Sequence, residues 1–142
     1  MVKIISIANQ KGGVGKTTTS VNLSASLVAY KKRVLLIDLD PQGNATMGSG
    51  INKQSCKLSV YHILTGRNST AEAIVHSDSG KYDVLPANRD LVAAEVELMK
   101  EIGRESRLKI ALNEVEENYD YIIIDCPPTL NMLTVNALVA SE

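Results

Sequence analysis

Large aromatic side chains are scarce in this sequence. It contains no Phe and no Trp, and its aromatic residues are five Tyr. The core is therefore expected to consist of Ile, Leu, Val and Ala, because hydrophobic residues still make up 44% of the chain. That fraction is ordinary for a packed domain and argues against a disordered chain. With 142 residues, the sequence has room for one domain but not for two.

Cysteine and histidine are also rare. Cys56 and Cys126 lie far apart, and the sequence has no CxxC and no Cys/His cluster. A structural zinc site is therefore not expected, and neither is a disulfide, because nothing in the sequence points to export. Cys126 follows an apolar run and is expected to be a buried thiol. His62 and His76 lack metal-ligand spacing, and we expect both to be helix or loop residues.

Long hydrophobic runs and an excess of charge are absent as well. No segment approaches the ~20 apolar residues of a membrane span, and the short apolar start continues into polar residues without a cleavage pattern. Lys and Arg number 15 and Asp and Glu number 16, so the formal net charge is −1. This balance offers no basic footprint for strong nucleic-acid binding. We expect a cytoplasmic protein in a reducing compartment.

Short apolar runs alternate with helical patterns along the chain. Four runs predict buried strands, at residues 4–8, 34–37, 82–85 and 121–125. Helical spacing is found at residues 17–30, 59–64, 69–75, 91–102, 108–115 and 130–139. This alternation predicts an α/β domain with a mostly parallel sheet flanked by helices. A doubly wound sheet usually has five or more strands, so the chain is expected to be the front part of a larger domain, incomplete at its C-terminus.

Two polar segments remain. The Gly-, Asn- and Ser-rich residues 41–57 are expected to form a long loop, and long loops in compact domains are usually functional or disordered. Residues 31–33 are Lys, Lys and Arg, and we expect them at the end of the first helix, where cations complement the helix dipole. A contact with a partner is the alternative for this basic run.

The strongest motif lies between the first predicted strand and the first predicted helix. It reads Lys11-Gly12-Gly13-Val14-Gly15-Lys16-Thr17-Thr18, in the context that a phosphate loop requires. Its glycines let backbone N–H groups approach phosphate oxygens, and the helix start adds more free N–H groups. Lys16 would place a positive charge at the β- and γ-phosphates, and the Thr17 hydroxyl can bind Mg²⁺. The general pattern GxxxxGK(S/T) is not met, because Gln10 replaces the first glycine.

Aspartates follow two of the predicted strands. Asp38 and Asp40 end the second strand, and both carboxylates could face the phosphate site at the carboxyl edge of the sheet. Asp125 closes the apolar residues 122–124 in a Walker B arrangement, where it would bind Mg²⁺ through water. An aspartate after an apolar strand is a weak signal alone, since solvated strand ends look the same, but it is strong beside a phosphate loop.

Together the motifs resemble those of the MinD/ParA group of ATPases, which have a deviant phosphate loop. Residues 8–18, 36–46 and 121–128 are similar to the ParA (Soj) branch, and the resemblance spans the whole chain. It implies ATP and Mg²⁺ as cofactors of a P-loop NTPase-like fold. The residues implied at the nucleotide are Lys11, Gly12, Gly13, Val14, Gly15, Lys16, Thr17 and Thr18. ParA-type chains normally continue well past this length, so residues 1–142 are expected to be the N-terminal part of a single ATPase domain.

The resemblance also implies roles for individual residues. Lys11 would reach across a nucleotide-sandwich dimer to the partner's phosphates and stabilise transition-state charge. Asp40 would position or activate the attacking water, while Asp38 would support Mg²⁺ and the loop. Residues 41–49 would form a switch-type loop that senses the γ-phosphate. The expected catalytic residues are Lys11, Lys16 and Asp40, and the expected metal residues are Thr17, Asp38 and Asp125.

Four functions remain open. The Asp-Pro-Gln-Gly-Asn run after the second strand favours a partitioning ATPase whose ATP-dependent homodimer is a switch in chromosome or plasmid segregation. The resemblance then implies a ParB-like centromere-binding partner, nucleoid association and non-specific DNA binding, mostly through residues beyond this chain. The alternatives are a MinD-like membrane-cycling regulator of cell division, a reductase like the nitrogenase iron protein, and a nucleotide-binding module without activity. The cysteine count disfavours the reductase.

Overall fold

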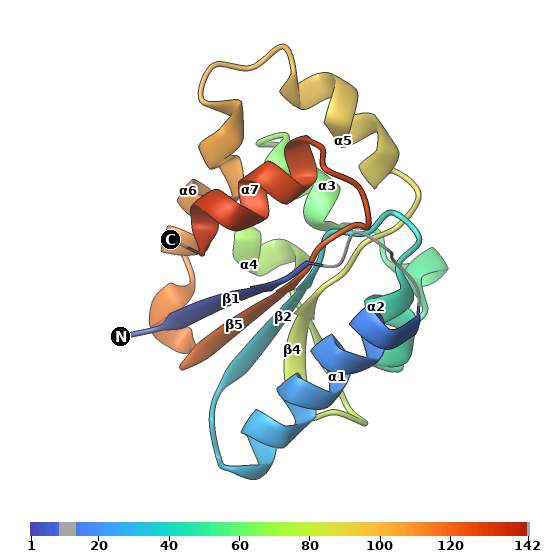
Figure 1. The fold of residues 1–142 in the computed structure, drawn as a ribbon, viewed down its shortest axis with the longest axis vertical. Helices are drawn as coiled ribbons and strands as arrows, with labels where there is room; N and C mark the ends of the chain where they lie inside the picture. Colours follow the sequence, from blue (N-terminus) through green and yellow to red (C-terminus); the bar gives the residue numbers. More distant parts are fainter. Residues whose placement is uncertain (9–13, 142) are drawn as a thin grey trace.

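A five-stranded sheet forms the centre of the computed structural model, which describes residues 1–8 and 14–141. Its strands lie in the order β1 (Lys3–Ile7), β5 (Tyr121–Asp125), β2 (Val34–Asp38), β4 (Tyr82–Leu85) and β3 (Val75–Ser77). The first four run parallel, and β3 at the edge runs antiparallel to β4 (Figure 1). The predicted mostly parallel sheet with flanking helices is therefore confirmed.

Helices cover both faces of this sheet (Figure 1). They are α1 (Val14–Ala29), α2 (Asn44–Gly48), α3 (Val60–Leu64), α4 (Thr70–Ala73), α5 (Leu91–Leu98), α6 (Arg107–Asn113) and α7 (Met132–Ala140). Three short 3-10 turns complete the description, η1 (Lys53–Ser55), η2 (Arg104–Ser106) and η3 (Glu116–Asn118). No helix in the described ranges is long and apolar enough to cross a membrane.

The pleat of the central strands divides the core into two layers. In β2, Leu35 and Ile37 face the layer under α3, α5, α6 and α7, while Val34 and Leu36 face the layer under α1. All five residues of β2 are buried, which explains why its sequence is a continuous apolar run rather than an alternating one. Both layers are built mainly from aliphatic side chains, as the lack of Phe and Trp requires.

The fifth strand was not predicted. The helix expected over residues 69–75 is shorter, because α4 ends at Ala73 and Ile74 is already extended. Val75 then begins β3, which pairs with β4 through a tight turn in which Lys81 has a φ of 61°. His76 accordingly lies on a strand rather than on a helix or loop. The expectation of four strands was wrong because a three-residue strand with polar members gives no apolar run.

Other boundaries also differ from the sequence prediction. The expected loop 41–57 contains the helix α2 and the turn η1, and the helix expected over 91–102 ends at Leu98. Helix α1 begins at Val14, earlier than predicted, and ends at Ala29. Lys31 adopts a φ of 62° just past that end, and the amide of Lys32 donates to the carbonyl of Leu27 at 3.0 Å. This is the left-handed termination that closes many helices.

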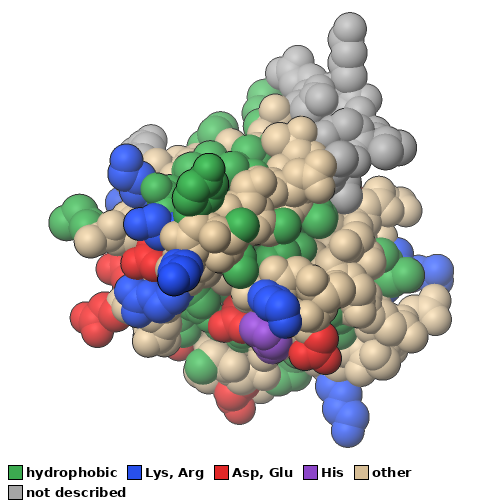
Figure 2. Space-filling view, turned by 90° about the horizontal axis from the view of Figure 1, so that it is seen from below, with side chains coloured by type: hydrophobic (Ala, Val, Ile, Leu, Met, Phe, Trp, Pro, Cys, Tyr) green, Lys and Arg blue, Asp and Glu red, His purple; other side chains and the backbone are tan. Residues whose placement is uncertain are grey.

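The basic run 31–33 lies beyond the end of α1, as expected. Within it, Arg33 pairs with Asp120 at 3.0 Å. In Figure 1 the connection between α1 and β2 is at the bottom of the view, and Figure 2 shows that face from below. Lys and Arg side chains are interspersed there with Asp and Glu. The described part of this face therefore carries mixed charge rather than a patch of one sign.

Candidate functional site

The carboxyl ends of the three strands β1, β5 and β2 meet at one edge of the sheet. Asp125 is in register with Ile7 on one side and with Asp38 on the other. Open α/β sheets bind their ligands at this edge. The parallel register therefore brings Asp38 and Asp125, two of the predicted site residues, side by side at the carboxyl ends of neighbouring strands.

The predicted phosphate loop falls largely outside the described residues. Nothing is described for Lys11, Gly12 and Gly13. The remaining motif residues are Val14, Gly15, Lys16, Thr17 and Thr18. Their backbone forms the beginning of α1, and only their backbone is described. Helix α1 has 16 residues and no acidic residue in its first turn. Its start therefore offers backbone N–H groups and a positive dipole end without a competing carboxylate.

Helix α1 is fastened to this edge by a buried hydrogen bond. The Ser20 hydroxyl donates to Oδ1 of Asp125 at 2.7 Å, and both side chains are fully buried. The carbonyl of Asp125 also accepts from the amide of Leu39 at 2.9 Å, and the amide of Cys126 donates to the carbonyl of Ile7 at 3.0 Å. These bonds fix the Asp125 backbone between its two neighbouring strands. Cys126 is buried, as predicted.

Both carboxylate oxygens of Asp38 accept hydrogen bonds inside the protein. Oδ1 accepts from the amide of Asp40 at 3.0 Å, and Oδ2 accepts from the amide of Thr46 at 2.9 Å and from its hydroxyl at 2.7 Å. Burial raises the pKa of Asp38 to about 7; the hydrogen bond from the Thr46 hydroxyl opposes this shift, and the negative charge of Asp125 adds to it. Asp38 therefore holds the chain segment that follows β2.

That segment is a tight turn carrying Asp40. The Asp40 side chain accepts from the amide of Gln42 at 3.0 Å, and its carbonyl accepts from the amide of Gly43 at 2.8 Å. Gly43 has a φ of 68°, and a Cβ atom there would lie 3.1 Å from the carbonyl oxygen of Ala87. Asp40 is 7% exposed. The turn is thus closed by its own side chain and fitted closely against the connection that follows β4.

Two residues of this edge were missed by the sequence analysis. Thr46 is fully buried, and its hydroxyl also accepts from the amide of Ala87 at 3.1 Å. Thr46 lies within the motif 36–46, but its role depends on a tertiary contact that the sequence does not display. Ser20 carried a better signal, because it follows Thr17 by three positions and therefore lies on the same side of the helix.

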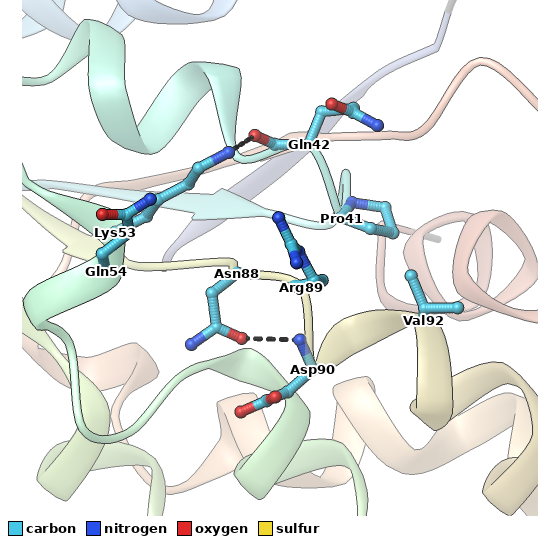
Figure 3. Close-up of a pocket in the computed structure, with 8 residues that line it drawn as sticks. All are labelled: Pro41, Gln42, Lys53, Gln54, Asn88, Arg89, Asp90 and Val92. Carbon is cyan, nitrogen blue, oxygen red and sulfur yellow. Dashed lines mark hydrogen bonds between the residues drawn. The ribbon is translucent and has the colours of Figure 1, made fainter.

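A polar cavity of about 530 Å³ lies beside the turn that follows β2. It is lined by Pro41, Gln42, Lys53, Gln54, Asn88, Arg89, Asp90 and Val92 (Figure 3). The Lys53 ammonium donates to the carbonyl of Gln42, and the amide of Asp90 donates to the Asn88 side chain at 3.0 Å. Figure 3 places the Arg89 side chain between Asn88 and the turn at Pro41 and Gln42. The turn at Pro41 and Gln42 is therefore open to solvent through a cavity lined by two basic side chains, Lys53 and Arg89.

No group of three or more His, Cys, Asp and Glu side chains that could hold a metal ion is found in residues 1–8 and 14–141. Nδ1 of His62 accepts from the amide of Ser59 at 3.1 Å and caps α3, while His76 pairs with Asp83 at 2.8 Å.

The family model and similar curated relatives agree on one family for this chain. The AAA domain family matches residues 2–142. The sporulation initiation inhibitor protein Soj of Bacillus subtilis is 57% identical over 142 residues, covering 100% of this chain and 56% of Soj. The chromosome partitioning protein ParA of Caulobacter vibrioides is 46% identical over 143 residues, covering 99% of this chain and 54% of ParA. The chain spans about half the length of the curated relatives it matches.

Solved structures share the fold. Cobyrinic acid a,c-diamide synthase from Mycobacterium smegmatis, with bound ADP and magnesium, has a TM-score of 0.96 and 44% identity, covering 99% of this chain and 57% of the synthase. A plasmid partition protein from Borrelia burgdorferi bound to AMPPNP has a TM-score of 0.82 and 33% identity, covering 100% of this chain and 59% of that protein. These similar structures were solved with adenine nucleotides or their analogues.

Proposed function

Because this chain belongs to the AAA domain family and is a homologue of Soj and ParA, we propose that it binds ATP with Mg²⁺ and hydrolyses it as part of a ParA-type partitioning ATPase. Residues 1–142 belong to a single ATPase domain in this proposal. The observation that carries it is the sheet edge, where Asp125 and Asp38 are register partners and Ser20 fastens the start of α1 beside them.

The residues at this edge fit a nucleotide. ATP with Mg²⁺, when bound, supplies the phosphoryl group that is transferred to water. The beginning of α1 presents backbone N–H groups for phosphate oxygens, and Lys16 places its charge at the β- and γ-phosphates. Thr17 and Asp125 would hold the cation, Thr17 through its hydroxyl and Asp125 through water. Asp38 acts mainly by holding the following turn, since both of its oxygens accept hydrogen bonds from the chain.

Asp40 orients the attacking water in this mechanism. Its carboxylate accepts from the Gln42 amide, so the side chain is held within the turn rather than left to rotate in solvent. Lys11 adds a positive charge to the phosphates of a second copy across an ATP-dependent homodimer. Hydrolysis then opens the dimer, and the switch segment after β2 reports the loss of the γ-phosphate.

The relatives support a cellular role in partitioning. Soj and two proteins named ParA for chromosome partitioning match nearly the whole chain. We infer a ParB-like partner, non-specific DNA binding mostly through residues outside 1–142, and a cytoplasmic, nucleoid-associated location. The mixed charge seen in Figure 2 and the net charge of −1 agree with a DNA-binding surface elsewhere.

Nucleotide binding by the 142-residue chain tests the first step. Titration with Mg-ATP should show binding to the parent chain and none to Lys16→Ala, because the variant lacks the charge at the phosphates. Lys32→Ala is the matched control, since this lysine is exposed beyond the end of α1. Equal affinity of Lys16→Ala and the parent would contradict the phosphate-loop assignment.

Turnover in the complete protein tests the second step. Asp40→Ala should bind Mg-ATP and dimerise but release no phosphate. The assay includes cobyrinic acid and ammonia as the source of amide nitrogen, because a cobyrinic acid a,c-diamide synthase shares the fold. ATP consumption that depends on cobyrinic acid and not on DNA or a ParB-like protein would refute the partitioning role. Normal turnover by Asp40→Ala would refute the role given to this aspartate.

A further inference from the structure

Thr46 lies where three segments of the chain meet. It is the third residue of α2, its amide and hydroxyl both donate to Oδ2 of Asp38, and its hydroxyl accepts from the Ala87 amide. The segments joined are the end of β2, the helix α2 and the connection from β4 to α5. Thr46 is fully buried, so no solvent can replace these bonds without a rearrangement.

Each hydrogen bond of the Thr46 hydroxyl has a consequence for the turn that carries Asp40. The bond to Asp38 orients the same carboxylate that receives the Asp40 amide through its other oxygen. The bond from Ala87 holds the β4–α5 connection against the turn, whose Gly43 lies close to the Ala87 carbonyl. A valine of similar shape would keep the packing but lose both bonds.

We propose that Thr46 is a positioning residue of the ATPase, whose hydroxyl sets the placement of Asp40 by holding Asp38 and Ala87 together. The inference rests on the proposed function, because it needs Asp40 to act on the attacking water. Thr46 itself touches neither nucleotide nor water in this role. It also links the turn to Asn88 and Arg89, which follow Ala87 and line the cavity beside it.

Substitution at Thr46 in the complete protein tests this role. Thr46→Val should lower kcat on the order of a hundredfold with KM for Mg-ATP changed by less than about threefold, because misplacing a catalytic group by about 1 Å costs that much in rate. Thr46→Ser keeps the hydroxyl and should restore kcat to within a few-fold of the parent. Thr70→Val is the matched control, since Thr70 is also fully buried but its hydroxyl donates to the carbonyl of Ala111 in α6 and not to Asp38.

A second readout needs no nucleotide. In Thr46→Val the Ala87 amide loses its acceptor, so hydrogen exchange of peptides containing Ala87 should become faster, while Thr46→Ser and Thr70→Val should exchange like the parent. Unchanged kcat in Thr46→Val, or an equal loss of kcat in Thr70→Val, would overturn the inference. So would a failure of both Thr46→Val and Thr46→Ala to fold and bind Mg-ATP, because Thr46 would then be purely structural.

Asp40→Ala in the same assay distinguishes a failure of the positioning role of Thr46 from a failure of the proposed mechanism. Loss of turnover in Asp40→Ala together with normal turnover in Thr46→Val rejects only the positioning role. Normal turnover in Asp40→Ala rejects the mechanism on which that role depends.

Discussion

The hydrogen bond between Ser20 and Asp125 fastens α1 to the aspartate that is predicted to bind magnesium, and its removal has a calculable effect. Ser20→Ala deletes a donor at 2.7 Å from a carboxylate oxygen in a fully buried environment. Hydrogen bonds to charged groups contribute about 1.5–3 kcal/mol. We therefore expect the free energy of unfolding to fall by about this amount.

The melting temperature translates this loss into an observable. An unfolding entropy of about 2.1 cal/mol/K per residue gives about 0.3 kcal/mol per kelvin for a chain of 142 residues. A loss of about 1.5–3 kcal/mol then lowers the melting temperature by about 5–10 °C. The measurement uses nucleotide-free protein in EDTA, because a ligand that binds only the folded state would add its own stabilisation.

Ser24→Ala provides the matched control for this experiment. Ser24 lies one turn further along α1 and is also fully buried, but its hydroxyl donates to the carbonyl of Ser20 at 2.9 Å rather than to a carboxylate. Such a bond back to the helix backbone adds little stability, so Ser24→Ala should melt within about 3 °C of the parent. Equal melting temperatures of Ser20→Ala and Ser24→Ala would refute the assignment of a stabilising bond to Asp125.

Three further predictions concern the turn, the opposite end of the sheet and the lysine of the motif. Gly43→Ala should destabilise the fold more than Gly66→Ala in urea denaturation. Both glycines have a positive φ, a conformation that costs other residues about 1–2 kcal/mol. Of the two, Gly43 is the one at which an added Cβ would also lie close to a backbone oxygen, that of Ala87. Hydrogen bonds from the Arg33 side chain and amide lower the pKa of Asp120 to about 2, so its contribution to stability is present above about pH 4 and lost as the pH falls through 2. Asp120→Asn should therefore be less stable than the parent at pH 7, with a difference that shrinks in denaturation curves as the pH approaches 2 and vanishes below it. Lys11→Ala should impair ATP-dependent dimerisation or hydrolysis, measured by gel filtration and phosphate release, while leaving the melting temperature unchanged; intact dimerisation and hydrolysis would rule out the lysine acting in trans.

The central strands could be predicted because strands that are buried on both faces consist almost entirely of aliphatic residues. β2 and β5 are covered on both faces, so nearly every position is aliphatic, and a run of that kind is visible without any knowledge of its neighbours. β3 could not be predicted because its three residues become a strand only by pairing with β4. The strand order, which the sequence does not display, puts Asp38 beside Asp125 at the carboxyl edge of the sheet.

Helix α2 shows why the rest of the site escaped the sequence. Its N-cap is Gly43, which has no side chain to offer, and the surrounding residues are typical of a loop. The missing cap is supplied by Asp38, which accepts from the Thr46 amide although it lies eight positions earlier in the chain. No local sequence pattern predicts a helix cap that comes from the end of the preceding strand β2. Both α2 and the role of Thr46 are therefore visible only in the three-dimensional structure.

The place of β5 between β1 and β2 sets the order in which the strands can pair while the chain is being synthesised. Among the described residues β1 has β5 as its one neighbouring strand, and Lys3 finds its register partner only at Tyr121. A nascent chain must therefore be synthesised as far as β5 before its first strand is paired, and contacts so distant in sequence slow folding. Until then the backbone of the first strand has no partner strand, and unpaired strands of this kind are prone to aggregation.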